Sequence, residues 1–493
     1  MLLNAICRAE KMDNSLPPEI TATNVLGWSP HVQSTTVTEP LLNYKILRVE
    51  QHIGSQDPLA RLKDEWIGLF YVNHLQRIPL VRWLSIRLWR TLYPIYINTF
   101  AVYFGSRASK RWRPLVKLGD YVNTLHLPTT KVFDAARVDT PAPKVFPVED
   151  QAYLVSPHDH YVFPPVYVAE LGDALIYGGT NLVFAQDAVI CHDLYDFERD
   201  YTSEELHGRH VIDAKKMRMR LLCHDPTPVK LAVAAAFVDA CAYNYAHWLT
   251  EVLPRIAVFC SIDQYANIPI IVDDGLHHNI MESLCLITRP EREIITLPVG
   301  RAIQADSLYI TSVVGYVPFV RRTNKLSGHS QGVFSPSAFE ILRNHLNPLG
   351  QKATGEDWPE KIFLRRNSGT RKISNAAEIE KLLIAHGYVI VEPEKLTFLQ
   401  QIKLCRNAKK IVSLTGAALA NAIVCKPGTQ VTVLMSKHEN MIYRYWVNLL
   451  NPFGIKVNYV LGNIIDQGFL GIHGDFAVNI ADVIELLNTL EDK

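Results

Sequence analysis

Short apolar runs alternate with stretches in which apolar residues recur at helical spacing, most regularly in the C-terminal third of the chain. Runs of four to seven such residues, bounded by charge, glycine or proline, predict buried strands of a parallel sheet. The predicted strands here are 361–364, 388–391, 409–414, 429–435 and 455–461. The predicted helices are 375–386, 397–407, 417–424, 443–450 and 479–489. This alternation predicts an α/β domain.

A second series of the same kind occupies the middle of the chain. Its predicted strands are 166–171 and 174–179, consecutive strands with a glycine turn, and then 182–184, 189–190, 231–238, 268–273, 294–297 and 307–310. A helix is expected at 244–255, with Pro254 ending or kinking it. We therefore predict an N-terminal extension at 1–120, a Rossmann-like domain at 121–330, a linker at 331–360 and a second Rossmann-like domain at 361–493. Two such domains predict a cleft, with ligands outside the carboxyl ends of the strands.

The N-terminal extension contains a segment of unusual composition, residues 66–119. It has no acidic residue, nine basic residues and many interleaved aromatic residues. This composition is typical of a segment that lies on an anionic membrane surface. Two alternatives remain open: an amphipathic region packed on its own protein, or a basic groove for an anionic acceptor.

Overall composition changes this picture little. The 493 residues are 48% hydrophobic and 20% charged, with a net charge of +1, so a nucleic-acid partner is not expected. Eight scattered cysteines without a Cys-x-x-Cys pair predict reduced thiols, and no His or Cys cluster has convincing metal spacing.

Residues 1–15 lack the apolar segment of a signal peptide, and no apolar run is long enough to span a bilayer. We expect a cytoplasmic protein, peripheral on the inner face of the cell membrane.

The strongest candidate for chemistry is the turn after the predicted strand 409–414. Thr415, Gly416, Ala417 and Ala418 form a small-residue turn, and Leu419 and Asn421 continue it as an apolar helix. The start of a helix offers unpaired backbone N–H groups and the positive end of a dipole, so it can hold a phosphate. A well-packed turn with no ligand is the alternative.

Three arginines follow another strand of the same predicted domain. Arg365 and Arg366 come directly after the strand 361–364, and Arg371 lies a few residues on. Guanidinium groups that face the Gly416 turn can clamp a diphosphate, and they can neutralise a leaving nucleoside diphosphate in place of a metal ion. Alternatively, some of them are solvated or pair with Glu392 or Glu394.

A titratable pair lies in the middle of the chain. His247 and Glu251 are four residues apart, so they share one face of the predicted helix, and either can take a proton from an acceptor hydroxyl. Asn244, Tyr245 and Trp248 are expected on the acceptor side of the cleft. A purely structural His–Glu pair is the alternative. The chain has no Gly-x-Ser-x-Gly, Walker A or Gly-x-Gly-x-x-Gly motif, which disfavours a hydrolase, an ATPase or a dehydrogenase.

Three blocks of the sequence together resemble glycosyltransferase family 61. They are 244–255, then 362–366 with Arg371 and Asn375, then 398–401 with 412–421 and 426–429. The resemblance implies a GT-B fold and an inverting, metal-independent transfer from a nucleotide sugar that binds mainly to the C-terminal domain. It implies no cofactor.

Among the members of that family, the chain looks like the bacterial type. The resemblance then implies a hexosyl- or pentosyltransferase of capsule or lipopolysaccharide synthesis, with a glycan or lipid-linked glycan as acceptor. Thr415 and Ala418 stand where the family usually has His and Gly. This departure keeps open an alternative, a non-catalytic GT-B module that binds a nucleotide or a glycan within a larger assembly.

Overall fold

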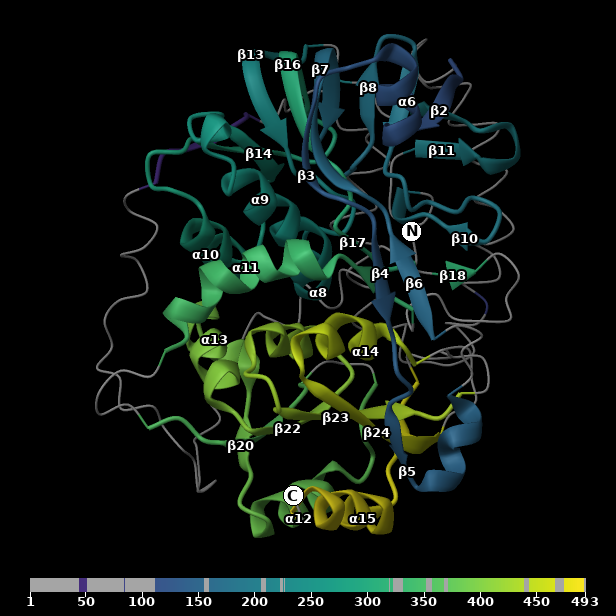
Figure 1. The fold of residues 1–493 in the computed structure, drawn as a ribbon, viewed down its shortest axis with the longest axis vertical. Coiled ribbons are helices and arrows are strands. Elements are labelled where there is room, and N and C mark those ends of the chain that lie inside the picture. Colours follow the sequence, from purple (N-terminus) through teal and green to yellow (C-terminus); the bar gives the residue numbers. More distant parts are fainter. Residues whose placement is uncertain are drawn as a thin grey trace.

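The structure is a computed structural model with mixed α/β architecture. It describes residues 44–50, 84, 111–154, 159–204, 210–221, 225, 227–318, 320–321, 331–351, 357–367, 371–438, 443–465 and 474–491. Two large sheets lie one above the other in Figure 1, with a layer of helices between them. The α/β class predicted from the sequence is confirmed.

The upper sheet is formed by the N-terminal half of the chain. The order of its described strands is β1-β15-β14-β13-β16-β7-β8-β9-β2-β12-β11, with β3 paired to β7. Strands β1, β15, β14, β13 and β16 run parallel, and β7 is antiparallel to β16. The bounds are β1 Ile46–Arg48, β2 Arg113–Lys117, β3 Thr129–Phe133, β7 Val166–Tyr177, β8 Val183–Ala185, β9 Ala188–Cys191, β11 His210–Asp213, β12 Arg218–Leu221, β13 Val229–Ala236, β14 Ile270–Asp273, β15 Ile294–Leu297 and β16 Ala302–Thr311.

Strand β7 corrects one prediction. The sequence predicted two strands with a glycine turn between them, but Val166–Tyr177 is a single strand. Asp173 takes a φ of 46° within it, so the Gly172-Asp173 pair makes a local irregularity and not a reversal. The strand stays continuous because β16 pairs with it from Val168 to Tyr177.

The lower sheet is formed mainly by the C-terminal half, in the order β21-β20-β22-β23-β24-β25, with β5 also paired to β24. Its strands are parallel except β25, as the run pattern predicted. Strand β5 comes from far upstream in the sequence, from within the predicted domain 121–330. The bounds are β5 Lys144–Phe146, β20 Lys361–Leu364, β21 Val389–Val391, β22 Lys410–Leu414, β23 Gln430–Ser436, β24 Lys456–Ile464 and β25 Phe476–Ala477.

Helices cover both faces of the lower sheet. Figure 1 shows α12 and α15 below it, and α13 and α14 above it, toward the helices of the upper half. The helices of the upper half that face them are α8, α9, α10 and α11. The bounds are α6 Leu118–Leu125, α8 Tyr245–His247, α9 Leu253–Cys260, α10 His278–Ile287, α11 Pro336–Leu349, α12 Ala376–Ala385, α13 Phe398–Asn407, α14 Tyr445–Leu450 and α15 Ile480–Glu491.

The helices of the two halves share one hydrophobic core. Helices α10 and α11 both contact α13, and one cluster of buried side chains runs from Trp248 and Leu253 through Phe339 to Leu419 and Trp446. Helix α11, which lies in the predicted linker 331–360, is part of this core. The predicted domain boundaries and the cleft remain predictions.

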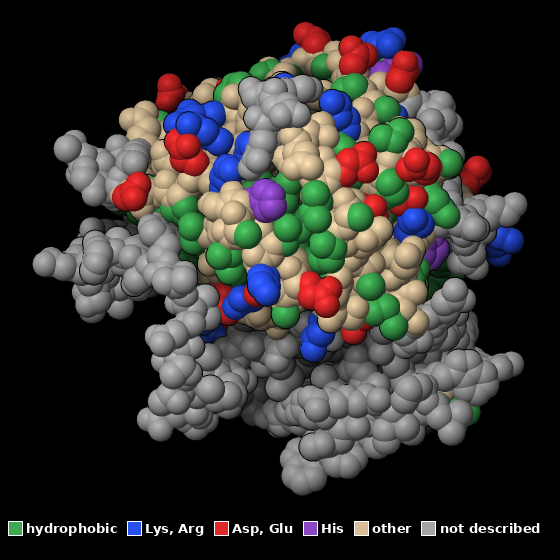
Figure 2. Space-filling model, turned by 90° about the horizontal axis from the view of Figure 1, so that it is seen from below, with side chains coloured by type: hydrophobic (Ala, Val, Ile, Leu, Met, Phe, Trp, Pro, Cys, Tyr) green, Lys and Arg blue, Asp and Glu red, His purple; other side chains and the backbone are tan. Residues whose placement is uncertain are grey.

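The surface at the end of the molecule that carries α12 and α15 is mixed in character. In Figure 2, acidic and basic side chains are dispersed singly and in pairs of opposite sign among hydrophobic ones over the described part of this face. The visible described surface therefore shows no extended patch of one charge.

Most of the basic aromatic segment 66–119 lies outside the described residues, so its predicted membrane contact stays a prediction. Its last part is described: Arg113–Lys117 forms β2 within the upper sheet. There Trp112 packs under the guanidinium of Arg218, which lies 4.4 Å from the ring centroid. In the described ranges, none of the helices combines the length and the apolar character needed to cross a bilayer.

Candidate active site

The predicted helix 244–255 forms, but it contains an irregular turn. The side chain of Asn244 caps its start by accepting a hydrogen bond from the Ala246 N–H at 3.0 Å. Residues Trp248–Val252 adopt a π-helical turn, and α9 then continues to Cys260 with Pro254 in its first turn. The helix continues past Pro254, so the prediction that it ends there is wrong, since a proline is tolerated in the first turn of α9. Whether Pro254 kinks the helix stays a prediction, and the irregular π turn lies just before it. Single π turns of this kind are frequent at functional sites.

His247 and Glu251 contact each other on this helix. His247 Nδ1 is hydrogen-bonded to Glu251 Oε2, and the second carboxylate oxygen accepts the Val317 N–H at 2.8 Å. Only 9% of the His247 side chain and 15% of the Glu251 side chain is exposed. A carboxylate that accepts from Nδ1–H fixes the tautomer of an imidazole, which leaves the lone pair on Nε2.

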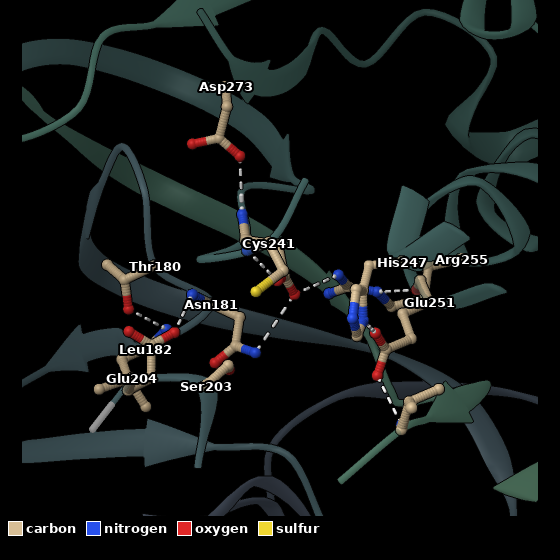
Figure 3. Close-up of polar contacts among 12 residues, drawn as sticks. Thr180, Asn181, Leu182, Ser203, Glu204, Cys241, His247, Glu251, Arg255 and Asp273 are labelled. Carbon is tan, nitrogen blue, oxygen red and sulfur yellow. Dashed lines mark hydrogen bonds and ion pairs between the residues drawn. The ribbon is translucent and has the colours of Figure 1, made fainter. Parts of the chain in front are cut away.

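A chain of polar contacts supports this pair from the upper sheet, as Figure 3 shows. Arg255 donates from Nε to the Glu251 backbone carbonyl at 2.8 Å and from Nη2 to Asp239 at 3.3 Å. Asn181 donates from its side chain to Asp239 at 3.3 Å and from its backbone to Glu204 at 3.0 Å. This network, defined as Glu204, Asn181, Asp239, Arg255, Glu251 and His247, links the end of β7 to the helix.

Two carboxyl groups are almost completely buried here: Glu204, in the network, and Asp273, which accepts the backbone N–H of Asp239 at 2.8 Å. Burial raises the pKa of Glu204 to about 8, although the Asn181 N–H hydrogen bond opposes the shift. Burial likewise raises the pKa of Asp273 to about 7, against hydrogen bonds from the backbone N–H groups of Asp239 and Gly179. Both groups thus hold a proton more tightly than ordinary carboxyls do.

The three predicted acceptor-side residues have structural partners. Asn244 caps the helix, and Trp248 is fully buried with its indole N–H donating to Ser283 Oγ at 2.8 Å. The Tyr245 hydroxyl donates to Asn421 Oδ1 at 2.8 Å, and Asn421 in turn donates to Gln401 at 2.7 Å. The Tyr245–Asn421 bond joins the helix of the titratable pair to the predicted donor turn.

The predicted donor turn follows β22 as expected, but the helix after it is 3-10. It spans Ala417–Val424, and Gly416 precedes it with extended backbone angles. The Arg366 side chain lies directly against Gly416, because a Cβ built there would be 2.5 Å from Arg366 Nη1. A guanidinium is thereby held beside the first backbone N–H groups of a helix, which have no partner within the helix.

The residues of this turn differ in exposure. Gly416, Ala417 and Ala418 are partly exposed, whereas Leu419 and Asn421 are fully buried and belong to the packing under the turn. The hydroxyl of Thr415 accepts a hydrogen bond from Trp446 Nε1 at 3.2 Å. The neighbouring Tyr445 contacts Thr250, in the π turn, through a 3.4 Å hydrogen bond, so the two candidate regions are joined side by side.

The other two predicted arginines lie differently from Arg366. Arg365 forms a two-pronged contact with Glu380, at 2.7 and 2.6 Å, and also contacts Glu392 at 3.3 Å. This is the alternative that the sequence left open, an arginine paired with neighbouring carboxylates. Arg371 is partly buried and takes a φ of 59°. It comes directly after residues 368–370, which lie outside the described residues.

The sequence did not indicate the supporting residues of the network. Asp239 follows the predicted strand 231–238 and Asp273 is the last residue of the predicted strand 268–273, which is the one signal that could have pointed to them. Asn181 and Glu204 lie in connections with no recognisable motif. Within the described ranges, no group of three or more His, Cys, Asp or Glu residues is arranged to hold a metal ion.

The fold and these contacts define an α/β protein in which a buried His–carboxylate pair is joined to a small-residue turn that Arg366 packs against. Residues 245–432 match the family model described as Glycosyltransferase 61, which supports membership of that family and identifies the protein as a glycosyltransferase. The match includes His247, Glu251, the three arginines and the Gly416 turn, and it begins one residue after Asn244. No curated protein matches the chain.

Proposed function

We propose that the protein is an inverting, metal-independent glycosyltransferase with a GT-B arrangement. It transfers a hexosyl or pentosyl group from a nucleotide sugar to a glycan or lipid-linked glycan. The donor binds to the C-terminal half at the Gly416 turn, and the acceptor binds to the N-terminal half. The observation that carries the proposal is the Arg366 guanidinium packed against Gly416.

Charge neutralisation is the main requirement of such a reaction. The leaving nucleoside diphosphate gains negative charge as its bond to the sugar breaks, and a preorganised cation lowers the energy of that state. Arg366 supplies the cation, and the backbone N–H groups at Ala417 and Ala418 supply hydrogen-bond donors and a helix dipole. Arg371 is a further candidate for the diphosphate, whereas the carboxylates around Arg365 support a structural role for it.

We assign the general base to His247 Nε2 and the positioning role to Glu251. The acceptor hydroxyl oxygen attacks the anomeric carbon while its proton moves to Nε2, and the bond from that carbon to the diphosphate oxygen breaks with its electron pair on the leaving group. Glu251 stabilises the imidazolium that forms, and the Val317 N–H holds Glu251 in place. A direct attack from the opposite face inverts the anomeric configuration.

The setting of the reaction is a further part of the proposal. The basic aromatic segment 66–119 is typical of proteins at anionic membrane surfaces, where lipid-linked glycans are built. We place the enzyme in the cytoplasm at the inner membrane face of a bacterium, in capsule or lipopolysaccharide synthesis.

Binding of nucleoside diphosphates tests the donor site. In calorimetry with UDP, GDP, CDP, ADP and dTDP, wild type should bind at least one of them. Arg366→Ala should raise its Kd about 10- to 150-fold, the loss of a charge-assisted hydrogen bond of about 1.5–3 kcal/mol. Arg137→Ala is the matched control, because Arg137 is an exposed arginine paired with exposed Asp139. Equal Kd values in wild type and Arg366→Ala would remove the proposed site.

The pH dependence of turnover tests the base. Transfer with the active donor should increase with pH as His247 loses its proton, and His247→Gln should abolish this rising limb with little change in nucleotide Kd. Glu251→Gln should lower kcat and shift the limb, because the imidazolium loses its carboxylate partner. An unchanged pH profile in His247→Gln would contradict the assignment.

A further inference from the structure

A large cavity lies in the N-terminal half, and none of the predicted site residues is among those that line it. Its volume is about 1160 Å³. Its described walls come from β6 (His160–Phe163), the segment 193–199, the turn around Lys215 and the segments 316–318 and 331–333. Because pockets of roughly 300–1,000 Å³ enclose drug-sized molecules, this one has room for more than a single sugar ring.

The charges of the cavity walls cancel. Two charged side chains already have partners: Arg199 is paired with Asp200 at 2.7 Å, and Asp193 accepts the Gly119 N–H at 2.7 Å. Of the other charges on the described walls, none forms a cluster of one sign. The basic and acidic lining residues are equal in number, namely Lys117, Arg199 and Lys215 against Asp193, Asp196 and Glu198. Such a wall does not favour a phosphate or another strong anion.

Aromatic rings alternate with these polar groups. Tyr161, Tyr195, Phe197 and Tyr316 all line the cavity, and Gln331 adds an amide. Tyr195, Phe197 and Tyr316 are almost fully buried and pack on one another, and the phenols of Tyr161 and Tyr195 bond Phe334 and Ser203. The half-buried Tyr161 ring suits the C–H face of a sugar, while the Gln331 amide and the charged side chains of the wall suit its hydroxyls. The wall chemistry fits an uncharged saccharide.

One wall of the cavity is also the support of the proposed base. Tyr316 and Pro318 line the cavity, and the Val317 N–H between them holds Glu251. The preceding Gly315 lies so close to the π turn that an added Cβ would be 2.0 Å from the Thr250 carbonyl oxygen. The cavity and the His247–Glu251 pair are therefore separated by a single layer of chain.

The same wall continues to the donor turn. Strand β17 (Gly315–Tyr316) pairs with β19 (Val333–Phe334), and Val333 lines the cavity. The Phe334 ring meets Tyr445 edge to face at 5.5 Å, and the adjacent Trp446 binds Thr415 beside Gly416. Cavity, base and donor turn thus follow one another along consecutive contacts.

Tyr316 is a residue of the cavity wall that lies next to the support of the base, beside Val317. The residue is 5% exposed, and its hydroxyl has no hydrogen-bond partner among the described residues. A buried hydroxyl without a partner costs about 1–3 kcal/mol, which a ligand in the adjacent cavity can recover once the Tyr316 ring turns toward it.

We propose that this cavity binds the acceptor, as an uncharged oligosaccharide segment whose reactive end is directed across Tyr316 toward His247. The proposal rests on the proposed function, since it names the substrate class of the same reaction. It assigns to the cavity wall a role in acceptor affinity and none in donor affinity.

Two exposed valines allow a matched test. Val162 lines the cavity and is 65% exposed, and Val148 is 64% exposed and is not among the lining residues. Saturation-transfer NMR with maltose, lactose, cellobiose, chitobiose and xylobiose should show binding of at least one to wild type and to Val148→Trp. Val162→Trp should weaken it at least about tenfold, equivalent to about 1.4 kcal/mol. Tyr316→Phe should weaken it as well, with the diphosphate Kd unchanged in every variant.

The outcomes separate this proposal from the proposed function. If none of the five sugars binds, or if both tryptophan variants bind them equally, the cavity is not the acceptor site, whatever the diphosphates do. Preferential binding of sialyllactose over lactose would overturn the assignment to an uncharged glycan. Sugar binding that only Val162→Trp and Tyr316→Phe weaken supports the cavity, even if diphosphates do not bind and the proposed function fails.

Discussion

Replacing Gly416 by alanine tests the contact on which the donor site depends. The backbone of Gly416 is extended, with a φ of 176°, so an alanine is not strained there. The new methyl group would lie 2.5 Å from Arg366 Nη1, well inside van der Waals contact, and the guanidinium must move away. The fold should survive, because the displaced atom is the far end of a flexible side chain.

The expected loss follows from the interaction that is displaced. A hydrogen bond from a charged group contributes about 1.5–3 kcal/mol, so Gly416→Ala should raise the Kd for a nucleoside diphosphate about 10- to 150-fold. Isothermal calorimetry measures the Kd, and the urea midpoint reports whether stability has changed. Gly172→Ala is the control glycine, because its added Cβ would meet nothing closer than 4.0 Å.

A double-mutant cycle makes the argument refutable. If the methyl group acts by displacing Arg366, Gly416→Ala should have little further effect in an Arg366→Ala background. Two effects that add in full would show that the glycine acts without the arginine. An unchanged Kd in the single Gly416→Ala variant would refute the contact itself as a determinant of binding.

Three further outcomes are expected. Asn421→Ala should lower stability by about 1–3 kcal/mol in urea unfolding, because it leaves Tyr245 and Gln401 without their buried partner. Arg365→Gln should lower the melting temperature slightly and leave the diphosphate Kd unchanged, since this arginine is held by carboxylates. Glu204 has a raised pKa, about 8 against an ordinary 4.5, so its contribution to stability is complete below about pH 4.5 and is lost as the pH rises through about 8. Glu204→Gln should therefore flatten the decline of melting temperature between about pH 5 and 8.

The local elements were predictable because their signals are local. Strands β20 to β24 and the helices between them fall within a few residues of their predicted bounds, since each is a compact apolar run. The short strands β5 and β25 of the same sheet were not predicted. The prediction for Val166–Tyr177 was wrong because a long-range interaction decides the structure of this segment. Gly172 and Asp173 are typical turn residues, but pairing with β16, more than a hundred residues away, keeps the strand continuous.

The sequence predicted the candidate site only where its residues follow a recognisable local pattern. The i, i+4 spacing pointed to His247 and Glu251, and the small residues after a strand pointed to Gly416. No spacing distinguished Arg366 from Arg365, because their partners, Gly416 and Glu380, are fixed by tertiary structure. The same holds for the cavity, whose walls join segments far apart in the sequence.

Strand β5 limits both the relative motion of the two halves and the places at which the chain can be truncated. It anchors an upstream segment to β24, the strand next to the end of the lower sheet, while the helices of both halves share one apolar core. A fragment that begins at residue 361 would expose the side of β24 that β5 covers and would tend to associate through it. Wide hinge opening of the two halves would have to break that core, so substrates should enter by local rearrangement of loops.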